Sequence, residues 1–281
     1  MSNNRKDHFY YIWSAAIILC LVLVLFTLIF VSCQGIASPL EDPSAAKKTE
    51  TSEPVTSDDG SPPESELPVN SGTQIDPSAV ELQQTEDFGQ EYLDKFVFLG
   101  DSTTYGLAAY GIVRKEQVWT PTNGTFSLFD QAHIKIKYPE TGAELTIEEI
   151  LELKKPEYML VTLGVNGVSN MPEDWFKSEY IALIGRIRRA SPDTKIIINS
   201  IYPIANSYAY QNEINNTKIV EANTWLIDIA ATTGTRFLNS HSCLVNEESV
   251  LPEDMHNSDG MHLTDAAFDK VMDYIRTHGY E

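Results

Sequence analysis

Four side chains in the last two-thirds of the sequence have the chemistry and the order that acyl transfer through a serine requires. Ser102 ends a Gly-Asp-Ser motif directly after an apolar run. Asn166 lies in a Gly-Val-Asn-Gly motif directly after a second apolar run. Asp259 and His262 belong to an Asp-Gly-Met-His motif just before a final amphipathic segment. Together they supply a nucleophile, an amide donor and an acid–base pair.

The expected nucleophile is Ser102, whose hydroxyl is weakly reactive until a base within hydrogen-bonding reach takes its proton. An imidazole is suited to this exchange near neutral pH, so His262 is the expected base and Asp259 the group that orients its ring. His256 also has an acidic residue three positions earlier, so spacing alone leaves it as a competitor. Taken alone, Ser102 would be interpreted as a helix N-cap, and the companion motifs favour the catalytic interpretation.

In this order, the three motifs resemble three of the four sequence blocks of the SGNH/GDSL hydrolase family, over roughly residues 92–281. The resemblance implies a serine hydrolase of carboxylic esters with a three-layer α/β fold. It favours His262 over His256, because the Asp-x-x-His pair of the family directly precedes the last helix. The family motif that contains the asparagine reads Gly-x-Asn-Asp, whereas in this sequence Gly167 follows Asn166. The amide is therefore kept, while the support of its loop differs.

The negative oxygen of a tetrahedral intermediate needs hydrogen-bond donors, and the Asn166 side chain is the first one expected. The Ser102 backbone N–H is another. The remaining family block implies a further donor from a glycine N–H, for which the sequence offers two candidates. Gly142 has the expected place shortly before a helix, and Gly124 lies in a polar turn beside Trp119, which could line the site. We lean to Gly142 and keep Gly124 as the alternative.

The elements that must position these residues are short apolar runs interleaved with amphipathic segments. The expected strands are 96–99, 158–163, 195–199 and 236–238. The expected helices are 102–110, 146–154, 175–190, 216–233 and 265–278. This alternation predicts a mainly parallel sheet covered on both faces, and the family resemblance implies an α/β/α sandwich of the flavodoxin-like, SGNH hydrolase type. Ligands bind such sheets beyond the carboxyl ends of the strands, where Ser102 and Asn166 are expected.

The N-terminal segment predicts attachment to a membrane. Arg5 and Lys6 precede the run Phe9 to Val31, which contains no charged residue and is long enough to cross a bilayer. The flanking positive charge predicts that the rest of the chain lies outside the cytoplasm. Residues 1–33 are therefore expected to be a cytoplasmic tip and transmembrane anchor. A lipoprotein signal ending at Cys33 is the alternative.

Composition then divides the rest of the chain. Residues 34–90 are rich in Pro, Ser, Thr, Glu and Asp, which predicts a disordered linker, and residues 91–281 are expected to form the hydrolase domain. The chain has 40 acidic and 20 basic residues, which argues against nucleic acid as a partner. Cys243 is the one cysteine of the expected domain, so no disulfide framework is predicted. No motif for a metal or a cofactor occurs, and none is expected.

These observations predict a membrane-anchored serine esterase. It would act through an acyl-enzyme on short acyl esters, O-acetyl above all, of extracellular or cell-wall glycans. Tyr202, Tyr208 and Tyr210 lie in a loop after an expected strand and could stack on sugar rings. The alternatives are an acyltransferase on wall polymer, a lysophospholipase or thioesterase, and a non-catalytic tethered binding module. The sequence does not indicate an oligomeric state.

Overall fold

The computed structural model describes residues 76–280. The predicted anchor at 1–33 and residues 34–75 of the predicted linker lie outside the described residues. Within 76–280, no helix has both the length and the apolar character needed to cross a membrane.

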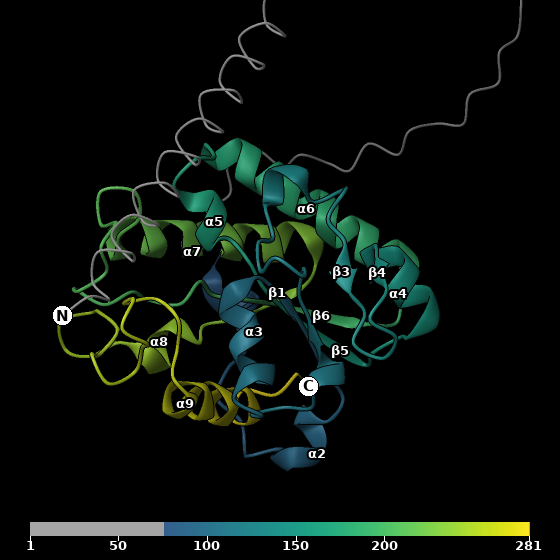
Figure 1. The fold of residues 1–281 in the computed structure, drawn as a ribbon, viewed down its shortest axis with the longest axis horizontal. Helices are drawn as coiled ribbons and strands as arrows, with labels where there is room; N and C mark the ends of the chain where they lie inside the picture. The colour runs from purple at the N-terminus through teal and green to yellow at the C-terminus, as the bar shows by residue number, and fades with distance from the viewer. Residues whose placement is uncertain (1–75, 281) are drawn as a thin grey trace, which may run out of the picture. The chain divides into compact units, whose positions relative to one another are not determined.

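A parallel sheet of five strands forms the centre of this part of the chain (Figure 1). In spatial order the strands are β2 (Val118–Trp119), β1 (Phe96–Gly100), β5 (Tyr158–Thr162), β6 (Lys195–Asn199) and β7 (Arg236–Leu238). The four predicted strands are confirmed. The edge strand β2 has no counterpart among the predicted strands, because two residues show no periodic pattern. The strand order changes direction between β1 and β5: β2 follows β1 on one side, and the later strands are added on the other side. Parallel sheets bind ligands beyond the carboxyl ends of the strands at such a switch point.

Alternate residues of each strand pack on opposite faces of the sheet, and both faces are buried. Val97 and Leu99 point to one face, and Phe96 and Phe98 point to the other. The first face is covered by α4 (Ile147–Leu153), α6 (Glu173–Ala190) and α7 (Asn216–Thr233). The second is covered by α2 (Gly89–Leu93), α3 (Ser102–Ala109) and α9 (Asp265–Arg276) (Figure 1). Burial on both sides explains why the strands have continuous apolar sequences.

Shorter elements connect these layers. A two-stranded antiparallel hairpin pairs β3 (Ile136–Lys137) with β4 (Glu144–Leu145). The remaining helices are η1 (Pro77–Ala79), η2 (Lys115–Gln117), η3 (Leu128–Asp130), α5 (Val165–Val168) and α8 (His241–Leu244). The predicted helix over 216–233 ends as expected, because Gly234 takes a left-handed conformation with φ of 64°.

The folded part begins well before the predicted boundary at residue 91. Glu81 forms a parallel bridge with Phe237, so the segment before α2 extends the sheet beyond β7. Leu82 is buried in the core with 4% of its surface exposed. The composition of 76–90 is polar, which is why composition alone predicts a linker there. A single buried leucine and backbone pairing hold the segment, and neither produces a periodic pattern.

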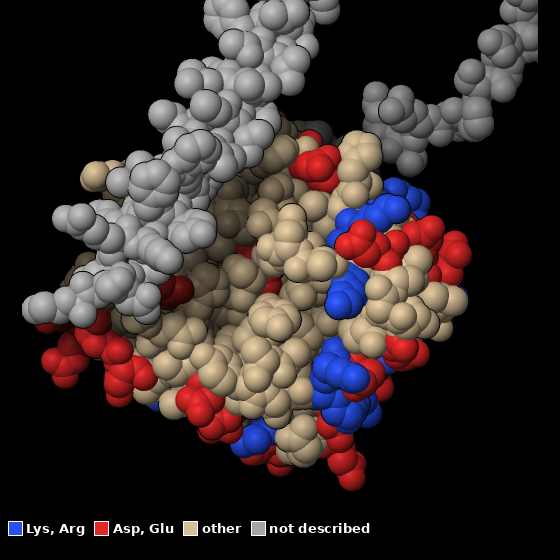
Figure 2. Space-filling model, in the orientation of Figure 1, with Lys and Arg blue, Asp and Glu red and all other residues tan. Residues whose placement is uncertain are grey.

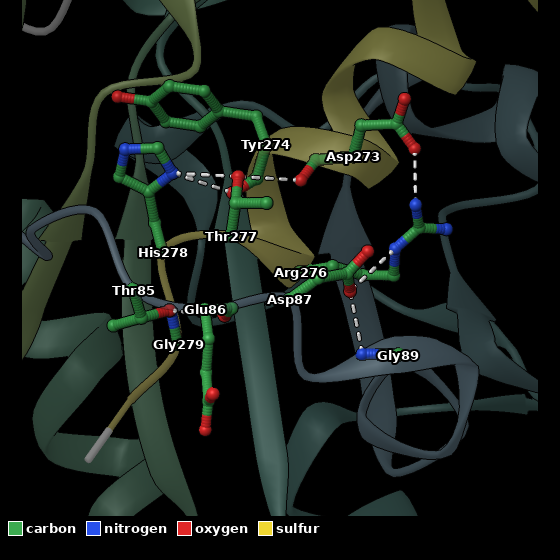
Figure 3. A network of polar contacts seen from close by, with 10 residues as sticks. All are labelled: Thr85, Glu86, Asp87, Gly89, Asp273, Tyr274, Arg276, Thr277, His278 and Gly279. Carbon is green, nitrogen blue, oxygen red and sulfur yellow. Dashed lines mark hydrogen bonds and ion pairs between the residues drawn. The ribbon is translucent and has the colours of Figure 1, made fainter.

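The same segment is fastened to the C-terminal end of the chain (Figure 3). Arg276 on α9 donates from Nε to the Asp87 carboxylate at 3.1 Å, and the same carboxylate accepts the Gly89 N–H at 2.7 Å. The Thr85 N–H donates to the Thr277 carbonyl at 2.7 Å. Residues 76–90 are therefore part of the domain.

Replacing Leu82 with alanine should lower the free energy of unfolding by about 2–5 kcal/mol, because it leaves a cavity where the segment packs on the core. Urea unfolding measures this change. The matched control is Leu153→Ala, since Leu153 is 65% exposed and its truncation should cost little. Equal effects of the two substitutions would show that the segment is not packed as described.

Candidate active site

Ser102 lies at the point where β1 ends and α3 begins. Asp101 is the N-cap of α3, and its carboxylate accepts the Thr103 N–H at 3.0 Å. Because the cap is Asp101, the Ser102 hydroxyl is free of that structural task. Gly100 has no substitute here, since a Cβ would lie 1.9 Å from Thr104 Oγ1 and 2.7 Å from the Thr162 carbonyl. This close approach, rather than a positive φ, requires the glycine.

Ser102, His262 and Asp259 form one continuous chain of hydrogen bonds. Ser102 Oγ lies 2.9 Å from His262 Nε2, across 160 positions of sequence. His262 Nδ1 lies 2.6 Å from Asp259 Oδ2. The other Asp259 oxygen accepts the backbone N–H groups of Met261, at 2.9 Å, and His262, at 3.0 Å. The carboxylate thereby fixes both the imidazole and the loop that carries it.

Asp259 stays ionised in this setting. Partial burial alone would raise its pKa, but the N–H donors of Met261 and His262 and the His262 ring outweigh the burial and leave the pKa of Asp259 below its usual range. An ionised Asp259 accepts from Nδ1–H, so that Nε2 presents its lone pair to the Ser102 hydroxyl.

Asn166 reaches the same site from the next strand, at the N-terminus of α5. Its Nδ2 donates to Asp101 Oδ2 at 3.0 Å, which leaves the second hydrogen of the amide for a ligand. Asp101 is fully buried, and that burial raises the pKa of its carboxyl against the opposing hydrogen bonds from Thr103. No sequence pattern identifies Asp101 as the residue that orients Asn166. Its place inside the Gly-Asp-Ser motif is the available signal.

The loop around Asn166 is supported by packing. Gly164 has φ of 134°, and a Cβ there would lie 2.7 Å from Ile201 Cδ1. A Cβ on Gly167 would lie 3.2 Å from Met171 Sδ and 3.3 Å from the Phe176 ring. At the position where the family pattern has an aspartate, the chain therefore packs tightly against an apolar wall.

Of the two candidate glycines, Gly124 is the one beside the nucleophile. A Cβ on Gly124 would lie 3.5 Å from Ser102 Cβ, whereas a Cβ on Gly142 would meet no atom within 4 Å. The Gly142 N–H donates to the Tyr138 carbonyl at 2.7 Å within the β3–β4 turn. The placement therefore favours Gly124, the alternative, over Gly142. The Gly124 N–H donates to the Pro121 carbonyl at 2.9 Å, so its turn must relax before that N–H can bind a ligand.

The competing histidine has a different environment. His256 is buried and lies 3.0 Å from Glu253 through Nε2, while Nδ1 accepts the Gly260 N–H at 3.1 Å. It also pairs with Leu263 in an antiparallel bridge. His256 therefore braces the loop that carries Asp259 and His262, and Ser102 is not among its partners.

Two of the four aromatic residues expected around the site are core residues, whereas Tyr208 is partly buried and Tyr210 is 58% exposed. Trp119 is fully buried in the core on the β2 end, and Tyr202 is 6% exposed, so neither offers a face to a sugar. Tyr208 and Tyr210 contact each other edge to face, with ring centroids 5.8 Å apart. Tyr105 on α3, which no sequence motif singles out, is 58% exposed beside the nucleophile.

Two hollows near Ser102 differ in size and polarity: Ser102 lines the larger one, and Thr103 and Met261, the sequence neighbours of Ser102 and His262, line the smaller one. The smaller, of about 10 Å³, is lined mainly by apolar side chains, among them Val165, Ile201, Ile204 and Met261. The larger, of about 710 Å³, is a groove between α3 and residues 120–124. Among the described residues, no group of three or more His, Cys, Asp or Glu side chains is placed to hold a metal ion.

Comparison with known proteins gives the class of this protein. Residues 98–270 match the model of the GDSL-like Lipase/Acylhydrolase family. The chain belongs to this family, and it is a serine hydrolase of the GDSL type. No curated protein sequence matches the chain.

One solved structure shares the fold, and others are similar at lower scores. A protein described as an acylhydrolase from Bacteroides fragilis has a TM-score of 0.50 at 17% identity, over 68% of this chain and 86% of its own. A protein described as a platelet activating factor from Streptococcus pneumonia has a TM-score of 0.49 at 19% identity, over 64% of this chain and 81% of its own. A carbohydrate esterase family 3 protein from Talaromyces cellulolyticus has a TM-score of 0.41 at 16% identity, over 64% of this chain and 92% of its own.

Replacing Asn166 with alanine should lower kcat about 10²–10³-fold on an aryl acetate, because one donor to the developing oxyanion is lost. KM should change little. The control is Asn170→Ala, an exposed asparagine one turn further along, which should leave kcat unchanged. An Asn166→Ala enzyme with a raised KM and normal kcat would show that the amide binds substrate in its ground state instead.

Proposed function

We propose that this hydrolase is an esterase that removes short acyl groups, acetyl above all, from carbohydrates through an acyl-enzyme on Ser102. The observation that carries the proposal is the hydrogen-bonded chain Ser102–His262–Asp259, with a large groove of mixed polarity at Ser102 and a small apolar hollow lined by the adjacent Thr103 and Met261. The hollow suits the acyl group and the groove suits the alcohol.

The proposed reaction has two halves. In the first, Ser102 Oγ attacks the ester carbonyl carbon while His262 Nε2 takes the hydroxyl proton. The carbonyl oxygen becomes negative and accepts from the Asn166 amide and the Ser102 N–H. The C–O bond to the alcohol then breaks, and the departing oxygen takes the proton from His262. In the second half, water attacks the acyl-enzyme by the same route, releasing the carboxylic acid and restoring Ser102.

The small hollow argues for a short acyl group. A volume of about 10 Å³ is near the minimum for one water molecule, which favours a methyl group over a longer chain. Its floor is held in place by two amides of α7. Asn223 bonds both backbone groups of Ile201, at 2.8 and 3.2 Å, and Asn216 bonds both backbone groups of Ile204, at 2.9 and 2.8 Å. Enlarging the hollow would require breaking these pairs.

Acetyl, butyryl and octanoyl esters of the same phenol test the proposal. The value of kcat/KM should fall with chain length, by roughly tenfold or more at each step, because longer chains do not fit the small hollow. Acetate release from an acetylated oligosaccharide then tests the alcohol part. A steady rise of kcat/KM through octanoyl would favour a lipase-like activity and reject the short-acyl proposal.

We also propose that the domain faces the outside of the cell on an N-terminal anchor, which would bring envelope or extracellular glycans within reach. The support is the uncharged run Phe9 to Val31 behind Arg5 and Lys6. Protease added to intact cells should digest the domain, and full protection of the domain would reject this orientation.

A further inference from the structure

The two walls of the groove at Ser102 differ in chemistry, one presenting an aromatic side chain and the other polar groups. One wall is α3, from which Tyr105 projects with 58% of its surface exposed. The opposite wall is the polar turn of residues 120–124, which contributes Thr120, Thr122 and Asn123. An exposed aromatic face opposite hydroxyl and amide groups suits a sugar ring, which has an apolar face and polar edges.

The charges of the groove oppose those of the whole chain. Acidic residues outnumber basic ones by 40 to 20 in the sequence. Yet the residues that line the groove include two lysines, Lys115 and Lys137, and no aspartate or glutamate. Figure 2 shows Lys and Arg side chains gathered, together with acidic ones, over the side of the molecule where the β3–β4 hairpin lies, whereas the charged side chains of the opposite and lower margins are mostly acidic.

The lysine on the hairpin keeps its charge available to a ligand. Lys137 takes part in none of the ion pairs within residues 76–280. Glu144 lies opposite Lys137 in the hairpin register, but its carboxylate accepts the Thr122 hydroxyl at 2.8 Å and lines the neighbouring hollow. Lys115 has one weak pair, with Glu116 at 3.9 Å.

We propose that the alcohol part of the substrate is a sugar carrying an anionic group, a carboxylate or a phosphate, which Lys115 and Lys137 bind. The inference rests on the proposed esterase function, because that function places the ester carbonyl at Ser102 and the acyl group in the small hollow. The sugar ring then lies along Tyr105, and its anionic substituent points to the hairpin end of the groove. An enzyme of high negative charge repels an acidic glycan in general, so the two lysines that line the same groove as Ser102, Lys137 without an ion pair among the described residues and Lys115 with a weak one, select where such a glycan can bind.

Three acetylated methyl glycosides test this inference: the glucuronate, its neutral amide of nearly equal size, and the larger glucose 6-phosphate. The wild-type enzyme should show a higher kcat/KM for the anionic substrates than for the amide. Lys137→Gln and Lys115→Gln should each reduce that preference roughly two- to fivefold, mainly through KM, which is the effect of an exposed ion pair. Lys270→Gln, an exposed lysine on α9 outside the groove, is the charge-matched control.

Added salt should weaken the preference of the wild-type enzyme and leave the rate on the neutral amide unchanged. This second measurement does not depend on how any variant folds. A larger preference for the carboxylate or for the phosphate identifies which anion the groove binds. Equal kcat/KM for the three substrates would overturn the inference while leaving the esterase proposal intact.

Binding to the Ser102→Ala protein, measured by titration calorimetry with the unacetylated glucuronate glycoside, separates the two proposals. Binding that Lys137→Gln weakens, with no hydrolysis of any acetyl ester by the wild type, would support the anion site and reject the esterase. Neither binding nor a charge preference in hydrolysis would reject the anion site.

Discussion

Replacing Ser102 with alanine should lower kcat on a short aryl ester by about four to six orders of magnitude. Without Oγ there is no atom to form the acyl-enzyme, and the imidazole of His262 has no proton to take. The fold should survive, because the N-cap of α3 is the Asp101 carboxylate and not the Ser102 hydroxyl. Initial rates on an aryl acetate and a thermal melt of the same sample measure the two effects.

A fluorophosphonate probe gives an independent readout of the same residue. It should label the wild-type chain at Ser102 and should not label the Ser102→Ala chain. Ser178→Ala is the matched control, since Ser178 is an exposed serine on α6 whose Oγ donates to the Trp175 carbonyl. If the Ser102→Ala enzyme keeps more than a few per cent of the rate, or if the label remains, another residue is the nucleophile.

Replacing Asp259 with asparagine should lower kcat by about 10⁴-fold. The amide oxygen can still accept the N–H groups of Met261 and His262, so the loop keeps its shape. The amide nitrogen, however, would donate to His262 Nδ1, which places the ring proton on Nε2. That tautomer cannot accept the proton of the Ser102 hydroxyl, and so the base is lost while the geometry remains.

The chain provides a matched control in its second carboxylate–histidine pair. Glu253 lies 3.0 Å from His256, with the same three-residue spacing as Asp259 and His262. Glu253→Gln should change kcat by no more than about twofold, since Glu253 is exposed and the pair braces a loop. If Glu253→Gln or His256→Ala costs more activity than Asp259→Asn, the roles of the two pairs are reversed.

The lowered pKa of Asp259 determines the direction in which folding stability changes with pH. A carboxyl whose pKa is lower in the folded chain contributes stability above its unfolded pKa, and this contribution is lost as the pH falls through the folded pKa. Asp259 therefore stays ionised across the mildly acidic range. Urea unfolding at a series of pH values should therefore show the Asp259 contribution to stability lost only at more acidic pH.

Much of the fold could be predicted from the sequence because its signals are local. The strands at 195–199 and 236–238 and the helix over 216–233 have the predicted bounds, since apolar runs and an amphipathic stripe mark buried elements directly. The interleaving of strands and helices then implies a parallel sheet, and a parallel sheet brings residues that follow different strands to one edge. That is why the sequence alone predicts that Ser102 and Asn166 lie together.

What the sequence by itself determined is thus the order of the elements, the class of hydrolase and the residues that could carry its chemistry. Only the tertiary structure decided that Gly124 and not Gly142 lies beside Ser102, that Asp101 holds Asn166, and that Trp119 is buried. It also decided that Lys115 and Lys137 line one groove. These facts depend on how irregular loops far apart in the chain meet. Such meetings are set by packing and hydrogen bonds across the whole domain, which leave no periodic trace in any one stretch of sequence.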